Sequence, residues 1–116
     1  MNYLLILNDP PYGTERSYNG LRLANSLAKD ETNSVSVFLM GDAASCGVAG
    51  QKTPNGYYNI ERMLKSLASK GEKIGVCGTC MDARGLNAEG LVEGAHRSSM
   101  DELTCWTQEA DKVLVF

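Results

Sequence analysis

Short apolar segments alternate along this chain with longer amphipathic segments, and this alternation restricts the possible folds more than any other feature. The apolar segments are predicted to form five strands, at residues 2–7, 34–40, 73–77, 91–95 and 112–116. The amphipathic segments are predicted to form helices, at residues 15–29, 58–70 and 99–110, with short helical turns at 42–46 and 80–84. Strands that alternate with helices in this way pair in parallel, because each helix returns the chain to the same end of the sheet.

Residues 3–7 and 35–40 lack the regular polar–apolar alternation of strands that have one face in water. We therefore predict a small doubly wound α/β fold, with a mostly parallel sheet of four or five strands and helices on both faces. The chain of 116 residues has no linker or repeat and is expected to form one domain, residues 1–116. The loops that follow the strands then meet at one edge of the sheet, at residues 8–13, 41–56 and 77–84.

Local signals set the expected limits of the helices. Thr14 and Asp42 each precede a helical pattern and are predicted to cap it. Ser99 and Glu102 have the spacing of a capping box at the start of the last helix. The apolar face of that helix is predicted to consist of Met100, Leu103, Thr107 and Ala110, with Cys105 packing beside it. Glycines and a proline in residues 47–57 predict a mobile loop.

The composition is that of a globular protein, with 43% hydrophobic and 22% charged residues. The net charge is −3 and no cluster of Lys and Arg occurs, which argues against direct contact with nucleic acid or an anionic membrane. Apolar runs such as 4–7 and 113–116 are too short to span a membrane, and no leader-like segment precedes them. We therefore expect a cytoplasmic protein, in which the four cysteines are reactive or metal-binding rather than disulfide-bonded.

The sharpest chemical signal is the sequence Cys77-Gly78-Thr79-Cys80, at the predicted junction of a strand and a short helix. Backbone N–H groups and the positive end of a helix at such a junction favour a thiolate over a thiol. A thiolate there can attack the persulfide or disulfide of another protein, and the second thiol can release the product or resolve a mixed disulfide. Gly78 is expected to permit a tight turn. The alternative interpretation is that both cysteines are packing residues.

Other candidate groups are assigned no catalytic role. A zinc site needs a second pair of ligands, whereas Cys46, His96 and Cys105 are isolated in the sequence, so no metal is predicted. Arg84 and Arg97 could offer positive charge to an anion or a thiolate, but a supporting role beside a helix is the simpler interpretation. Acidic residues are expected on solvated faces, namely Glu61, Asp82, Glu89 and Glu93. No phosphate-binding, dinucleotide-binding or serine-hydrolase motif occurs, so no cofactor is predicted.

Several segments, in their order and spacing, resemble the DsrE/DsrF-like family, which includes sulfur-relay subunits of the TusD type. These segments are Asn8-Asp9 and residues 37–42, 56–64, 76–86, 91–94, 98–103 and 110–113. The resemblance implies a doubly wound α/β subunit that assembles into homotrimers or homohexamers. It also implies that a cysteine after the third strand accepts sulfur as a persulfide, and this cysteine corresponds to Cys77. Cys80 is the extra cysteine of the subgroup that carries Cys-Gly-Thr-Cys.

The leading hypothesis is a cytoplasmic sulfur carrier between a donor and an acceptor protein, in which Cys77 takes the sulfur and Cys80 assists or resolves. Family members of the TusD type pass sulfur toward tRNA modification in a three-protein complex. This chain, with its own pair of cysteines, looks more like the self-assembling branch of the family. Two other hypotheses stay open. One is an oligomeric ligand- or partner-binding module with structural cysteines, and the other is a thiol–disulfide oxidoreductase.

Overall fold

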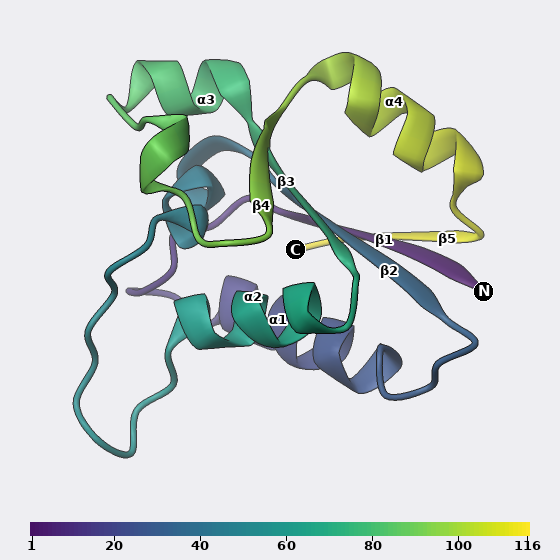
Figure 1. Cartoon of the computed structure of the whole chain (residues 1–116), viewed down its shortest axis with the longest axis horizontal. Coiled ribbons are helices and arrows are strands. Elements are labelled where there is room, and N and C mark those ends of the chain that lie inside the picture. Colours follow the sequence, from purple (N-terminus) through teal and green to yellow (C-terminus); the bar gives the residue numbers. More distant parts are fainter.

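The computed structural model describes all 116 residues and contains one five-stranded sheet. The strands are β1 (Asn2–Leu7), β2 (Ser34–Leu39), β3 (Lys73–Cys77), β4 (Ala95–Ser98) and β5 (Lys112–Val115). Their order across the sheet is β4-β3-β2-β1-β5, and all four neighbouring pairs are parallel (Figure 1). The chain moves outward from β1 to β4 and then crosses to the other side of β1, which is the doubly wound topology predicted from the sequence.

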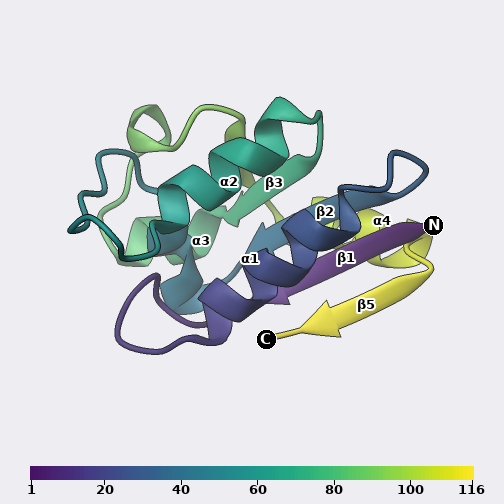
Figure 2. The same ribbon diagram turned by 90° about the horizontal axis from the view of Figure 1, so that it is seen from below.

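Helices cover both faces of the sheet, as the sequence predicts. Helices α1 (Arg16–Leu27) and α2 (Ile60–Ser69) lie side by side on one face, and α4 (Met100–Glu109) lies on the other (Figures 1 and 2). Three short helical segments complete the elements, namely η1 (Gly41–Gly47), α3 (Gly78–Ala83) and η2 (Ala88–Gly90). None of the helices combines the length and the apolar composition that crossing a bilayer requires.

The two faces bury unequal cores. A cluster of 18 buried residues fills the space between the sheet and the α1/α2 layer, and Leu64 and Leu67 of α2 are fully buried in it. The opposite face holds a cluster of four buried residues, Leu4, Phe38, Leu103 and Trp106. The rings of Phe38 and Trp106 meet edge to face, with centroids 6.1 Å apart. The α4 face is therefore the more thinly covered one.

The fourth strand does not lie where the sequence predicts it. Of the strand predicted at 91–95 only Ala95 belongs to β4, and the residues before it form a loop, in which Leu91 forms a single antiparallel bridge with Val48 and Val92 is buried. Gly94, with φ of +93° and no space for a Cβ beside Ala68, then turns the chain into β4. Because β4 is an edge strand, it carries polar residues such as His96 and is not recognisable by hydrophobicity.

Two predicted helix caps are wrong. Helix α1 begins two residues after Thr14 and has no side-chain cap, because the Thr14 hydroxyl donates to Asp9 Oδ2 over 2.8 Å instead. Asp42 lies inside η1, and its carboxylate accepts from Arg84 rather than from the start of a helix. The predicted cap at Ser99 is confirmed, since its hydroxyl accepts from the Glu102 amide over 3.2 Å.

The predicted inner face of α4 is also partly wrong. Leu103 and Trp106 form the buried contact with the sheet. Met100 is 61% exposed, and Cys105 is exposed rather than packed. The Trp106 ring packs on Gly75 of β3, where a Cβ would lie only 3.1 Å from the ring, so the face of α4 that meets the sheet includes Trp106, which the predicted face left out.

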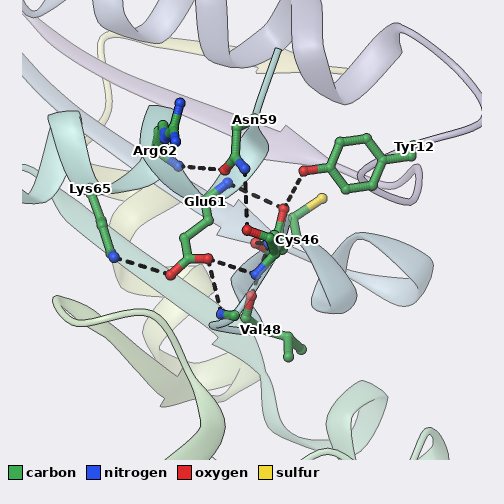
Figure 3. Close-up of polar contacts among 9 residues, drawn as sticks. Tyr12, Cys46, Val48, Asn59, Glu61, Arg62 and Lys65 are labelled. Atoms are coloured by element: carbon green, nitrogen blue, oxygen red, sulfur yellow. Dashed lines mark hydrogen bonds and ion pairs between the residues drawn. The ribbon is translucent and has the colours of Figure 1, made fainter. Parts of the chain in front are cut away.

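The segment predicted as a mobile loop is fixed at its beginning by polar contacts with α2 (Figure 3). Glu61 is buried, not solvated as predicted, and one of its carboxylate oxygens accepts from the amides of Gly50 and Gln51 over 3.0 and 2.8 Å. The Gln51 side chain donates to the carbonyls of Cys46 and Val48, each over 2.9 Å. A buried carboxylate that accepts two backbone amides removes the freedom that glycine would otherwise give this stretch.

Candidate functional site

Cys77 and Cys80 lie at the carboxyl edge of the sheet, where β3 ends and α3 begins. Cys77 is the last residue of β3 and packs against the small cluster under α4. Cys80, one turn further on, packs against the large cluster on the other side of the sheet. Both are free thiols and both are partly exposed. The pair therefore straddles the end of the sheet, and each cysteine is partly exposed to solvent.

The sulfur of Cys77 receives specific hydrogen bonds from the residues that follow it. The Cys80 amide donates to Cys77 Sγ over 3.3 Å, and the Thr79 hydroxyl lies 3.4 Å from the same sulfur. Burial opposes ionisation, but hydrogen bonds from the side chains and amides of Cys80 and Thr79 outweigh it, so the pKa of Cys77 is below its ordinary value. Cys77 is therefore the more acidic thiol of the pair and the better nucleophile near neutral pH.

The sulfur of Cys80 is held from a different strand. The Gly41 amide, directly after β2, donates to Cys80 Sγ over 3.2 Å. Burial and the hydrogen bond to Cys77 raise the pKa of Cys80, and the Gly41 amide and the Arg84 charge oppose this rise only in part. The two cysteines thus have pKa values that are shifted in opposite directions. This is the arrangement of one reactive thiolate and one protonated neighbour.

An ion pair fixes α3 against the neighbouring strand β4. The guanidinium of Arg97 donates to the two carboxylate oxygens of Asp82 over 2.7 and 3.0 Å and to the Gly78 carbonyl over 3.1 Å. A Cβ on Gly78 would lie 2.9 Å from Arg97 Cζ and 2.9 Å from the Ser98 carbonyl oxygen. Gly78 is thus required for close approach of β4. The tight turn predicted at Gly78 is made without a left-handed backbone conformation, since the φ of this residue is not positive.

A second ion pair fixes α3 on its other side. Arg84 donates from Nε and Nη2 to Asp42 Oδ1 over 3.1 and 2.8 Å, and from Nη1 to the Cys80 carbonyl over 3.1 Å. The six-residue helix that carries the dithiol is therefore held by one arginine–aspartate pair on each side. Both arginines have a structural role, as the simpler interpretation of the sequence predicts. Their charges also lie near the two sulfurs.

The remaining candidate residues do not join the dithiol. Cys46 is fully buried, donates to the Asp9 carbonyl over 3.6 Å, and has its pKa raised to about 12 by burial. Such a thiol is unreactive at neutral pH. His96 lies on β4, beside Trp106 and in contact with the carboxylate of Glu102. The same carboxylate accepts from the Ser98 hydroxyl over 2.6 Å, so this group fastens β4 to α4.

Sequence reasoning correctly predicted that loops after different strands meet at this edge. It did not identify the Gly41 amide or Asp42 as neighbours of the dithiol. One weak indication that Arg84 lies near the dithiol was present in the sequence. Arg84 follows Cys80 by four residues, which places the two on the same face of a helix. Nothing in the sequence linked Arg97 to Asp82, because that pair depends on the register of a strand that was misplaced.

The dithiol lies at an open edge rather than in a deep cavity. The largest groove, of about 940 Å³, runs between α1 and α2, and its lining contains no cysteine. An exposed pair of thiols with opposite pKa shifts can perform thiol exchange, in which one thiolate attacks a sulfur and the second thiol attacks the product. Such a site can accept sulfur directly from a group presented by another protein.

Known proteins are similar to this chain over nearly its whole length. The sequence profile of the DsrE/DsrF-like family matches residues 1–116. Protein YchN of Escherichia coli is 41% identical over 114 residues, which cover 97% of each chain. The uncharacterized protein MJ0989 of Methanocaldococcus jannaschii is 35% identical over 116 residues and the full length of both chains.

Solved structures agree with this result. The crystal structure of YchN from E. coli superposes over the whole of both chains with a TM-score of 0.90 and 39% identity. The structure of MTH1491 from Methanobacterium thermoautotrophicum superposes with a TM-score of 0.74 over 99% of this chain and 98% of that chain. At 13% identity, the latter similarity concerns the fold alone.

Proposed function

Because this chain belongs to the DsrE/DsrF-like family, we propose that it is a sulfur carrier that holds sulfur as a persulfide on Cys77. The observation that carries the proposal is the set of hydrogen bonds to Cys77 Sγ from the Cys80 amide and the Thr79 hydroxyl. These bonds favour the thiolate, which is the form that attacks sulfur. The partial exposure of the side chain leaves the sulfur within reach of another protein.

The proposed loading step is a simple exchange. The Cys77 thiolate attacks the outer sulfur of a donor persulfide, R–S–SH, to give Cys77–S–SH and the donor thiolate, R–S⁻. No electrons leave or enter the pair of reactants, because the sulfane sulfur only changes its carrier. The donor and the acceptor are proposed to be proteins of the cytoplasm, since the partly exposed cysteines lie at the sheet edge, where another protein can contact them.

Mass spectrometry of the intact chain tests this proposal. The reduced protein is incubated with a cysteine desulfurase and free cysteine and is compared with the Cys77→Ser and Cys80→Ser variants. The expected result is a gain of one sulfur atom in the wild-type and Cys80→Ser chains at the earliest time points, reversed by dithiothreitol and absent in Cys77→Ser. Equal loading of Cys77→Ser and wild type contradicts the assignment of Cys77. The Cys105→Ser variant is the matched control, because this thiol is exposed but far from the dithiol in sequence.

We also propose that copies of the chain assemble as a homotrimer or homohexamer, as the family resemblance implies. The thinly covered α4 face and the exposed Val115 on the edge strand β5 are compatible with burial against a neighbour. Light scattering coupled to gel filtration measures the mass directly. Three or six times the chain mass of 12.5 kDa supports the proposal, and a monomer contradicts it.

A thiol–disulfide oxidoreductase is the second candidate, and the direct contact between Cys80 N–H and Cys77 Sγ favours it. It requires that a disulfide substrate converts the pair reversibly into an internal Cys77–Cys80 bond. If an excess of a small disulfide never protects both thiols from alkylation together, this candidate fails. A binding module with structural cysteines predicts instead that both thiols react slowly with alkylating reagents at neutral pH.

A further inference from the structure

We infer that Cys80 discharges the sulfur carried by Cys77 as hydrosulfide, with formation of a Cys77–Cys80 disulfide. This inference rests on the persulfide function proposed above and adds a reaction to it. A carrier that only hands on sulfane sulfur needs one cysteine. The structure places a second free thiol one helical turn after the first and holds its residue with groups that do not touch Cys77.

The geometry selects the sulfur that Cys80 can reach. The Cys80 amide donates to Cys77 Sγ over 3.3 Å, so the residue that carries the second thiol lies directly against this sulfur. When Cys77 carries a persulfide, this same Sγ becomes the inner sulfur, and the added sulfur extends from it. Cys80 therefore lies beside the inner sulfur, and attack there expels the outer sulfur as HS⁻.

The contacts of Cys80 suit an attacking group. The Gly41 amide donates to Cys80 Sγ over 3.2 Å, and a bond from a backbone amide stabilises the thiolate more than the thiol. Arg84 fixes the Cys80 carbonyl and brings a positive charge to the same side. Gly41 has φ of +55°, a conformation that glycine adopts without strain, so the amide that contacts Cys80 depends on a glycine at this position.

The reaction balances without an additional oxidant. The Cys80 thiol first gives its proton to solvent, and Cys77–S–SH and the Cys80 thiolate then give the Cys77–S–S–Cys80 disulfide and HS⁻. The expelled sulfur gains two electrons, and the two cysteine sulfurs supply them as they join. A dithiol reductant, either a small dithiol or a reduced dithiol protein, then returns the pair to two thiols and takes the disulfide in exchange.

The alternative reaction is attack of Cys80 on the outer sulfur. That reaction moves the persulfide from Cys77 to Cys80 and releases no hydrosulfide. It needs the Cys80 thiol to reach an atom beyond Cys77 Sγ, whereas the contact that Cys80 makes with Cys77, through its amide, is with Sγ itself. The two reactions have different products, so a measurement of the products distinguishes them.

The experiment follows a single turnover after loading. Reduced wild-type, Cys80→Ser and Cys77→Ser chains are pulsed with sodium tetrasulfide, desalted, and incubated without reductant. Hydrosulfide is trapped with monobromobimane, and trypsin digestion reports the state of the dithiol. Cleavage after Lys73 and Arg84 yields a peptide of residues 74–84, which contains Cys77 and Cys80 but neither of the other cysteines.

The wild type is expected to release one hydrosulfide per loaded chain while the 74–84 peptide loses two hydrogen atoms. The Cys80→Ser chain is expected to keep the added sulfur at least about tenfold longer, because the attacking thiol is absent. Persistence of the persulfide in the wild type for as long as in Cys80→Ser overturns the inference. Transfer of the sulfur to Cys80 without release of hydrosulfide also overturns it.

These outcomes are separable from failure of the carrier function itself. If no variant gains sulfur on Cys77, the proposed function fails before discharge can be observed. If Cys80→Ser holds a stable persulfide and the wild type does the same, the carrier stands and discharge is wrong. Circular dichroism of each variant, together with Cys80→Ala as a second substitution, excludes loss of folding as the cause.

Discussion

Arg97 on β4 forms a two-point ion pair with Asp82 on α3, with nitrogen–oxygen distances of 2.7 and 3.0 Å. The same guanidinium lies against Gly78, the residue that follows Cys77. The first turn of the helix that carries the dithiol is thus pressed directly onto the edge strand. The position of Cys77 depends on the fit between an arginine side chain and a residue without a Cβ.

The first prediction concerns this fit. A Gly78→Ala substitution places a Cβ 2.9 Å from Arg97 Cζ and 2.9 Å from a backbone oxygen of Ser98. The Arg97 side chain can move away from the added Cβ, but the Ser98 oxygen belongs to the backbone of β4 and can move only if the strand shifts. We therefore expect a loss of about 1–3 kcal/mol in the free energy of unfolding. We also expect slower alkylation of Cys77, because α3 is displaced. Urea denaturation and the rate of reaction with iodoacetamide measure the two effects.

Gly90→Ala is the matched control for that substitution. Gly90 has nothing within 4 Å of an added Cβ and no positive φ, so the change is expected to alter stability by about 0.5 kcal/mol or less. If Gly78→Ala is as stable and as reactive as Gly90→Ala, close approach of β4 does not position the dithiol.

The sequence predicted the fold well where hydrophobic burial determines it. Strands β1 and β3 have the predicted bounds, and the apolar pattern of α2 places Ile60, Leu64 and Leu67 in the core. These elements are central or fully covered, so their buried positions carry apolar residues and their pattern can be recognised in the sequence. The edge strand β4 has one open side and polar residues, and for that reason its pattern resembles a loop.

The candidate site, like the fold, could be predicted from the sequence only in part. The strand-end position of Cys77 followed from the apolar run before it, and its pairing with Cys80 followed from the spacing of the two residues. The sulfur of Cys77 is bonded by the residues that follow it, but the sulfur of Cys80 is bonded by the Gly41 amide from the end of β2. A backbone amide is present at every residue except proline, so no sequence pattern marks the one that contacts a sulfur.

The second prediction concerns the Thr79 hydroxyl, which lies 3.4 Å from Cys77 Sγ. Thr79→Val keeps the shape of the side chain and removes the donor to the thiolate. The pKa of Cys77 is then expected to rise toward its ordinary value. Since one hydrogen bond contributes about 0.5–1.5 kcal/mol, alkylation near neutral pH should slow by about two- to tenfold. The measurement is the pH dependence of the alkylation rate of Cys77 in a Cys80→Ser background.

Thr104→Val on α4 is the control, because its hydroxyl donates only to the Met100 carbonyl and touches neither cysteine. Its pH profile is expected to match that of the unsubstituted chain. An unchanged midpoint in Thr79→Val means that the backbone amides alone set the acidity of Cys77.

The third prediction concerns the buried carboxylate of Glu61. Burial opposes ionisation, but bonds from the Gln51 and Gly50 amides and the nearby Lys65 ammonium outweigh it and lower the pKa of Glu61. Glu61→Ala leaves both amides without their acceptor, so we expect a loss of about 1.5–3 kcal/mol at neutral pH. Urea denaturation at several pH values measures this loss, with Glu89→Ala, an exposed acidic position, as the control.

The pH dependence of that loss has a definite sign. The folded pKa of Glu61 lies below the unfolded one, so its stabilising contribution is complete above the ordinary glutamate pKa of about 4.3. It is lost as the pH falls through the folded value. The stability difference between the wild type and Glu61→Ala should therefore be constant from neutral pH down to about 4.3 and should shrink in more acidic buffer. A difference that grows on acidification contradicts the role of the ionised carboxylate.

The last prediction tests whether Arg84 acts on Cys80 through its charge. In a Cys77→Ser background the coupling between the two thiols is removed, and the peptide that contains Cys80 holds no other cysteine. Arg84→Met removes the positive charge that lowers the pKa of Cys80 and keeps most of the aliphatic side chain. The midpoint of Cys80 alkylation is expected to move to higher pH, and adding salt should reduce the difference between the two chains because ions screen exposed charges.

Arg97→Met in the same background should leave the midpoint in place, since Arg97 bonds to Asp82 and Gly78 rather than to Cys80. Equal shifts from both arginine substitutions would show that α3 had been displaced and that charge near Cys80 was not the cause.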